Sequence, residues 1–186
     1  MNIGKYTAQG IPAAFTGQRT KKKEDKAEFK ASMAQAAKPV NKEYIIYTKT
    51  DDMLYSGGNG SGLSYYIKYA EESTEEDPVV IAKGVDENGQ EFEQTIHINK
   101  ISPHHATLVE MHALEAHVGV DKNGGLSSLP LAPDLGNMGL NDRRDFINMF
   151  RNTISDMTLL KQREAVAYYQ YSMQMYEDFI LKPRWK

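Results

Sequence analysis

Apolar and polar residues alternate in several short segments between positions 43 and 100, and this pattern limits the folds open to the chain. In the segment Glu91–Ile98, Phe92, Ile96 and Ile98 fall on one side of an extended chain. A period of two is that of a half-buried antiparallel strand. We therefore predict a small antiparallel β-sheet of about four strands. The predicted strands are Glu43–Lys49, Leu63–Ala70, Pro78–Val85 and Glu91–Ile98.

Two glycine-containing segments connect these strands. The segment Asp86–Gly89 joins the last two, and its Asn-Gly pair supplies the positive φ that a tight hairpin turn needs. The segment Ser56–Gly62 resembles a phosphate-binding loop, but it lacks the Lys-Ser/Thr pair of such loops. A strand follows it, so there is no helix N-terminus to bind an anion, and we predict a flexible loop.

Helical patterns replace the strand patterns after residue 101. Ser102 and Pro103 are typical of a helix start and Gly119 of a helix end, so we predict a helix over residues 102–118. The loop over residues 119–139 is rich in glycine and proline. A loop of this length is uncommon in a compact domain, so we expect it to be either packed as a lid or mobile.

A second helical region follows over residues 141–181. Asn141 or Asp142 is its predicted N-cap, and Ser155-Asp156 is a candidate break. The apolar stripes are too short for an extended coiled coil, so we expect this region to pack on the sheet. The first stripe consists of Phe146, Phe150, Thr153, Met157 and Leu160.

Together these elements predict an α+β fold, in which C-terminal helices cover a small antiparallel sheet. We predict a single domain over residues 43–186, with the sheet at 43–100, and an extended or helical N-terminal arm over residues 1–42. Within the arm, Lys21–Lys38 is rich in helix formers, and Pro39 ends this possible short helix.

The composition excludes several classes of function. The chain has no cysteine, which removes disulfides, thiolate zinc sites, iron–sulfur clusters and a thiol nucleophile. The net charge of −3 gives no electrostatic reason to expect a nucleic-acid partner. No apolar stretch is long enough for a signal peptide or a membrane span. We expect a cytoplasmic protein with no membrane partner and no cofactor, and export by a signal-independent route stays open.

All five histidines fall between His97 and His117. None is three or four residues from another, which is the spacing at which two helical side chains share an ion. His112 and Glu115 have that spacing, but a metal would need a further element to converge on them. Surface or capping histidines are the simpler interpretation. The alternative metal site consists of His97, His104, His105, His112 and Glu115.

Tyrosines and methionines cover most of the circumference of the predicted helix at Ala165–Phe179. One face must pack on the domain. The other face is either buried as well or exposed as an interface, since these residue types are enriched in protein interfaces. The candidate interface residues are Tyr168, Tyr169, Tyr171, Met173, Tyr176 and, near the end of the chain, Trp185.

The run Gly84–His117 combines the hairpin signal with helix-start residues. Its distinctive residues are Gly84, Asp86, Asn88, Gly89, Ile98, Asn99, Ile101, Pro103, Ala106, Glu110, Ala113 and Leu114. Through these residues the run is similar to a stretch of uncharacterised proteins of Firmicutes, grouped as a domain of unknown function. The resemblance implies a bacterial protein, and it brings no activity that could be assigned to a residue.

No set of catalytic residues converges in the sequence, so we expect a non-enzymatic protein. It would act through protein–protein contact, either by self-association or by docking to a larger assembly. The arm and the helix rich in tyrosine and methionine favour this function. The alternative is a small metal-dependent enzyme or metal-binding module that uses the His97–His117 cluster.

Overall fold

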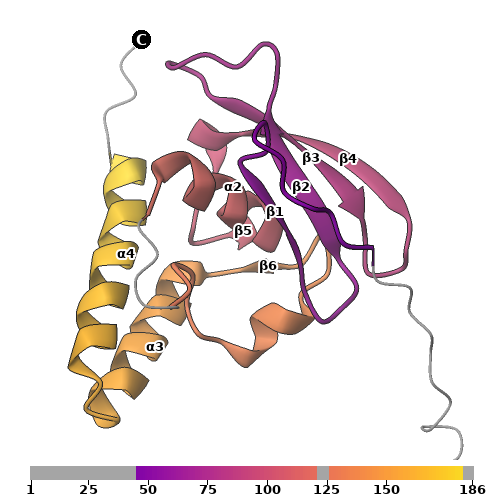
Figure 1. Ribbon diagram of the computed structural model, residues 1–186. Coiled ribbons are helices and arrows are strands. Elements are labelled where there is room, and N and C mark those ends of the chain that lie inside the picture. Colours follow the sequence, from indigo (N-terminus) through magenta and orange to yellow (C-terminus); the bar gives the residue numbers. More distant parts are fainter. Residues whose placement is uncertain (1–44, 121–125, 182–186) are drawn as a thin grey trace, which may run out of the picture. The chain divides into compact units, whose positions relative to one another are not determined.

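The computed structural model describes residues 45–120 and 126–181 of the 186-residue chain. The chain divides into residues 1–41 and 42–186, and every described residue belongs to the second part. The predicted arm and Trp185 therefore lie outside the described residues. These residues form an α+β fold, as predicted, in which a four-stranded antiparallel sheet is followed by helices (Figure 1).

The strands of the main sheet lie side by side in chain order, and each pairs antiparallel with its neighbour. At the centre of the sheet, Gly84 lies opposite Tyr65 on one side and opposite Phe92 on the other. The strands are β1 (Tyr55–Gly58), β2 (Ser64–Tyr69), β3 (Val79–Val85) and β4 (Glu91–His97).

The predicted hairpin between β3 and β4 is confirmed. Gly89 has a φ of 79° and supplies the left-handed position of the turn. One carboxylate oxygen of Asp86 accepts hydrogen bonds from the backbone N–H groups of Gln90 and Asn88, both at 2.8 Å. The bond from Gln90, followed by that from Asn88, lowers the pKa of the Asp86 carboxyl because both favour its charged form.

The first strand lies elsewhere than predicted. Residues 45–50 form no strand, and Ile46 is 84% exposed. β1 instead comes from the glycine-rich segment that was predicted to be a flexible loop. A Cβ at Gly58 would lie 2.8 Å from the carbonyl oxygen of Leu63, so glycine permits the close approach of β1 to β2.

Helix α2 (Leu108–Val118) begins later than predicted, and the start at Ser102 is wrong. Thr107 is the N-cap, and its hydroxyl accepts a hydrogen bond from the N–H of Glu110 at 3.2 Å. The Glu110 carboxylate in turn accepts the N–H of Thr107 at 2.8 Å, which completes a capping box. The predicted end is confirmed, because Gly119 is a left-handed cap with a φ of 71°.

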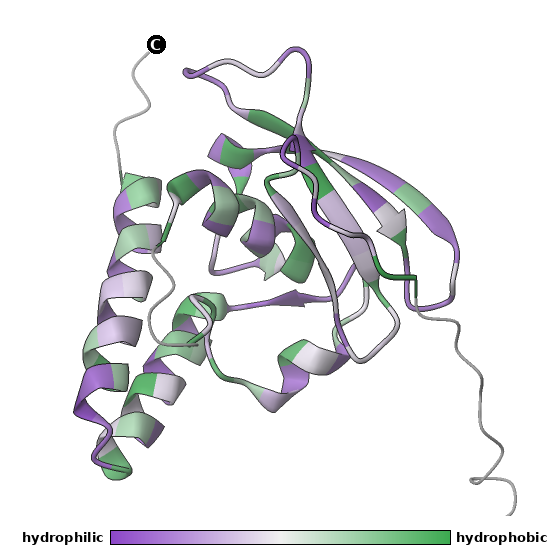
Figure 2. Cartoon of the chain, viewed as in Figure 1, coloured by the Kyte–Doolittle hydropathy of each residue, from purple (hydrophilic) through white to green (hydrophobic). Residues whose placement is uncertain are grey.

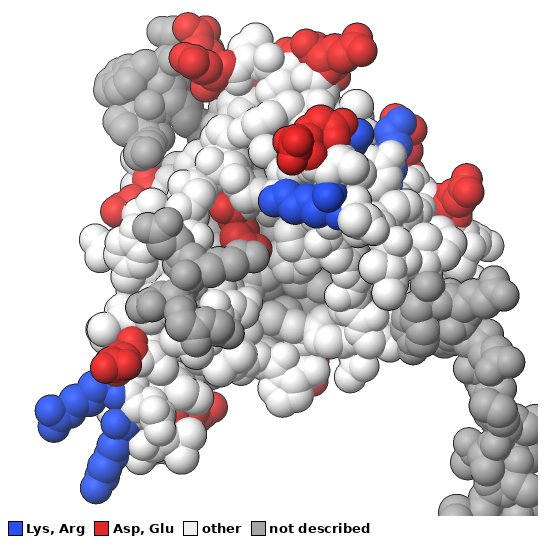
Figure 3. All heavy atoms as spheres, in the orientation of Figure 1, with Lys and Arg blue, Asp and Glu red and all other residues white. Residues whose placement is uncertain are grey.

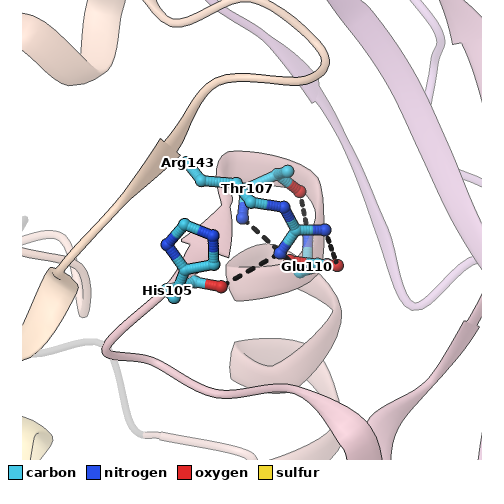
Figure 4. A network of polar contacts seen from close by, with 4 residues as sticks. All are labelled: His105, Thr107, Glu110 and Arg143. Atoms are coloured by element: carbon cyan, nitrogen blue, oxygen red, sulfur yellow. Dashed lines mark hydrogen bonds and ion pairs between the residues drawn. The ribbon is translucent and has the colours of Figure 1, made fainter.

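Arg143 connects two distant segments at the start of α2 (Figure 4). It belongs to β6 (Arg143–Arg144), which pairs with β5 (Ala106–Thr107). Its guanidinium donates two hydrogen bonds to the Glu110 carboxylate, both at 2.9 Å, and one to the carbonyl oxygen of His105 at 3.0 Å. The β5–β6 pair holds the residues before α2 in an extended form, which explains the late helix start.

The second helical region consists of two helices. Asp145, and not Asn141 or Asp142, caps the first of them, and its carboxylate accepts a backbone N–H of the first turn at 2.9 Å. The break falls at residues 160–162 and not at Ser155-Asp156, where the chain stays helical. The two helices are α3 (Phe146–Leu159) and α4 (Arg163–Leu181).

Helix α2 contacts β1 and α4, and α3 packs along α4 (Figure 1). One cluster of buried side chains joins the sheet and the helices. None of the helices in the described ranges is long and apolar enough to cross a membrane. The largest fully buried side chains are Tyr65 of β2, Phe146 and Phe150 of α3, and Tyr169 and Tyr176 of α4.

The described part of the predicted loop over residues 119–139 is packed. Leu129 and Met138 are buried in the core, at 2% and 1% exposure. The Asn59 side-chain amide donates a hydrogen bond to the carbonyl oxygen of Met138 at 2.7 Å. A short 3-10 helix, η2 (Pro133–Asn137), lies between these anchors, whereas η1 (Ile98–Lys100) follows β4 directly.

Candidate functional site

The turn between α3 and α4 exposes two adjacent leucines. Leu159 is 78% exposed and Leu160 is 63% exposed. Burying a leucine side chain contributes about 1.5–3 kcal/mol, so burial of this pair against another surface would be favourable. Figure 2 shows hydrophobic residues beside hydrophilic ones at this end of the helical hairpin.

Lys161 gives the turn its shape. Its φ of 58° makes it the one non-glycine residue with a positive φ in the described ranges. The N–H of Lys161 donates to the carbonyl oxygen of Thr158 at 3.0 Å, and the N–H of Gln162 donates to that of Met157 at 2.9 Å. This pair of bonds ends many helices, and glycine normally occupies the left-handed position. A side chain there costs about 1–2 kcal/mol.

A groove of about 580 Å³ lies beside this turn, along the first part of α4. Val166 and Ala167 supply its aliphatic lining, and Lys161 and Arg163 are its charged residues. Neither cation forms an ion pair with another residue of the described ranges, whereas Arg151 of α3 pairs with α4. Figure 3 shows basic side chains at this end of the molecule, with acidic ones nearby.

A second candidate lies in the core, where polar side chains connect β2, α2 and the loop before η2. The Tyr65 hydroxyl lies 2.6 Å from His112 Nδ1. His112 Nε2 lies 4.0 Å from a carboxylate oxygen of Glu115, and the Ser128 hydroxyl donates a hydrogen bond to the other oxygen. A cavity of about 240 Å³ opens beside Glu115 and Tyr55.

The chemistry of this core cluster is that of a structural link. Burial raises the pKa of the Tyr65 hydroxyl well above its usual value, so the phenol stays neutral and can donate to His112 Nδ1. The ring of Tyr55 stacks on the imidazole of His112 with ring centroids 4.1 Å apart. Burial raises the pKa of the Tyr55 hydroxyl too. In a catalytic triad the serine contacts the histidine, whereas the hydrogen bond of Ser128 goes to Glu115.

Tyrosine-to-phenylalanine substitutions will show which hydroxyl groups in the core stabilise the fold through a hydrogen bond. Tyr65→Phe is expected to lower the free energy of unfolding by about 1–2 kcal/mol, because it removes the hydrogen bond to His112. Tyr169→Phe is expected to leave this free energy unchanged or to raise it by about 1 kcal/mol. Its hydroxyl is buried without a hydrogen-bond partner among the described residues. Urea unfolding followed by circular dichroism measures both.

The same two variants also control for each other, since both remove one hydroxyl from a fully buried ring. Equal losses of stability in Tyr65→Phe and Tyr169→Phe would contradict the expectation that the Tyr65 hydroxyl stabilises the fold more than the Tyr169 hydroxyl does. A loss in Tyr169→Phe alone would show that its hydroxyl has a partner in the folded protein.

The histidines of the predicted metal site have separate partners. His97 Nδ1 lies 3.4 Å from a carboxylate oxygen of Asp77, and His104 Nδ1 lies 3.4 Å from one of Asp145. Within residues 45–120 and 126–181, no three His, Asp or Glu side chains are placed to hold one metal ion. The structure therefore does not bring together the residues of the alternative metal site, which are His97, His104, His105, His112 and Glu115.

The predicted interface on α4 is mostly buried. Tyr168 is 6% exposed, and Tyr169 and Tyr176 have no exposed surface. These three tyrosines belong to the core, so their assignment to a free surface is wrong. Tyr171 is 48% exposed and Met173 is half-buried, so among the described residues of the predicted interface these two reach solvent.

Comparisons of the chain with protein-family models, with curated proteins and with solved structures find no significant match. The resemblance of Gly84–His117 to Firmicutes proteins therefore stays a prediction. The function has to be argued from the side chains themselves, and the α3–α4 turn combines exposed apolar side chains with a groove and with cations that form no ion pair in the described ranges.

Proposed function

We propose that the protein acts by binding another protein through the turn between α3 and α4. The observation that carries this proposal is the exposure of two adjacent leucines, at 78% and 63%, where one helix ends. The centre of a protein interface is depleted of charge and gains its energy from apolar burial. We define the turn surface as Leu159, Leu160, Lys161, Arg163 and Val166.

Contacts between α3 and α4 join the two helices that carry this surface, which favours binding. Phe150 of α3 packs against Tyr176 of α4 with ring centroids 5.8 Å apart, and against Tyr169 at 6.4 Å. Arg151 also pairs with Glu177 across the two helices at 3.6 Å. A surface that is already ordered loses less conformational entropy on binding. The partner is either a second copy of the chain or a component of a larger assembly, and both would use the turn surface.

The double variant Leu159→Ser/Leu160→Ser is expected to weaken the association at least about tenfold, because each leucine would be buried on binding. A photoreactive amino acid at position 160 measures the association in the cells that make the protein. We expect a discrete cross-linked species that the companion change Leu159→Ser suppresses. Sedimentation velocity of the purified chain shows whether the partner is a second copy.

Leu181 provides the matched control. It is 76% exposed and ends α4, at the far end of that helix from the turn. A photoreactive group at position 181 should give no cross-link that depends on Leu159. A chain that stays monomeric at every concentration and gives no discrete cross-link from position 160 would rule out this function.

A further inference from the structure

The charged lining of the groove beside the α3–α4 turn is entirely basic. Lys161 and Arg163 line it, whereas Asp156 and Glu164, which are near in sequence, do not. The two cations lie next to the aliphatic lining of Val166. Positive charge beside apolar surface complements a carboxylate that neighbours an apolar side chain.

The backbone of Lys161 is an independent sign that its side chain matters. Glycine at this left-handed position would avoid the cost of about 1–2 kcal/mol that a side chain pays there. Residues held in such conformations cluster at functional sites. What lysine adds over glycine at this turn is a positive charge at the edge of the groove.

We infer that this groove binds an acidic segment of the partner protein, with a carboxylate on Lys161 and Arg163 and a neighbouring apolar side chain against Val166; this rests on the function proposed above. The exposed leucines extend the apolar contact beyond the groove. An anionic membrane fits less well. Asp156 and Glu164 at the same helix ends would repel its surface, and two cations give weak attraction.

Two labelled peptides test the charge preference on the full chain. In the first, glutamates alternate with leucines, and in the second, glutamine replaces every glutamate. Fluorescence anisotropy at low salt is expected to show at least about tenfold tighter binding of the glutamate peptide, and added salt should reduce this difference. Equal binding of the two peptides, or binding of neither, would overturn the inference.

Lys161→Gly separates binding from folding. It is expected to raise the midpoint of thermal unfolding, because glycine adopts the left-handed backbone at no steric cost, and to weaken glutamate-peptide binding about tenfold. Arg163→Gln should weaken binding similarly without raising that midpoint. Lys100→Gln removes an exposed cation at the end of η1 and should leave binding unchanged. An equal loss of affinity in Lys100→Gln would mean that only net charge is sensed.

The results also distinguish this inference from the proposed function. A Leu159-dependent cross-link from position 160, combined with no preference for the glutamate peptide, would keep the binding function and discard the acidic partner. If neither the Leu159-dependent cross-link nor the preference for the glutamate peptide is observed, both the binding function and the acidic partner are discarded. Binding to phosphatidylserine vesicles without binding to the glutamate peptide would assign the groove to a membrane surface and overturn the inference.

Discussion

Gly84→Ala is expected to lower the free energy of unfolding by about 3 kcal/mol or more, a large part of the ~5–15 kcal/mol that stabilises a typical domain. A Cβ at this position would collide with the carbonyl oxygen of Ser64 and would lie 2.6 Å from the Cα of Tyr65. Both atoms belong to the backbone of β2, which cannot rotate away as a side chain could. β2 and β3 would have to separate at the centre of the sheet. Urea unfolding monitored by far-ultraviolet circular dichroism measures the loss.

Gly136→Ala is the matched control for this substitution. Gly136 has no atom within 4 Å of the position that a Cβ would take, and its φ lies outside the left-handed region. Its substitution is expected to change the free energy of unfolding by no more than about 0.5 kcal/mol. A Gly84→Ala protein as stable as the Gly136→Ala protein would contradict the close β2–β3 approach.

Glu110→Ala is expected to cost about 2–4 kcal/mol of unfolding free energy. The Glu110 carboxylate, 14% exposed, accepts the N–H of Thr107 and two of the guanidinium hydrogen bonds that Arg143 donates. Its removal breaks the capping box of α2 and leaves the Arg143 charge without its partner. The connection between α2 and β6 is thereby lost, and chemical denaturation measures the effect.

Glu93→Ala controls for the loss of an ion pair in general. The carboxylate of Glu93 lies 2.9 Å from Lys83, but both side chains are well exposed. Exposed pairs contribute about 0–1 kcal/mol, so this variant should be nearly as stable as the parent. If Glu110→Ala and Glu93→Ala cost the same, the capping network adds no stability beyond an ordinary surface pair.

Three of the four strands could be predicted because burial on one face imposes a period of two on the sequence. In β4, Ile96 is buried while Glu91, Glu93 and Thr95 are exposed, as the alternation predicts. The hairpin between β3 and β4 could be predicted as well, because only a few residue types adopt the positive φ of Gly89. These signals are local, and each depends on one residue or one face.

The errors in the fold arose where distant segments decide the structure. Residues 45–49 are rich in β-branched and aromatic side chains but pair with no strand of the described ranges, whereas the glycines of β1 allow its close approach to β2. The start of α2 has a local signal in the capping box of Thr107 and Glu110, which the prediction missed, and a distant support in Arg143, 33 positions after Glu110. Strand propensity and helix-cap signals carry no information on such contacts.

The candidate site was missed for a related reason. The apolar stripe of α3 was predicted to include Leu160, but the helix ends before it and leaves it 63% exposed. Neither glycine nor proline marks this end, because Lys161 takes the position that glycine usually fills. The tyrosines of α4 were misassigned because their burial depends on how α3 packs, as the contact of Phe150 with Tyr176 shows.

β4 forms one margin of the four-stranded sheet and has β3 as its neighbour in that sheet. An unpaired strand margin can recruit further chains and seed fibrils unless charged side chains discourage it. Glu91 and Glu93 are exposed along β4 and supply that charge. The carboxylates of β4 therefore oppose cross-β pairing between copies of the protein along this margin.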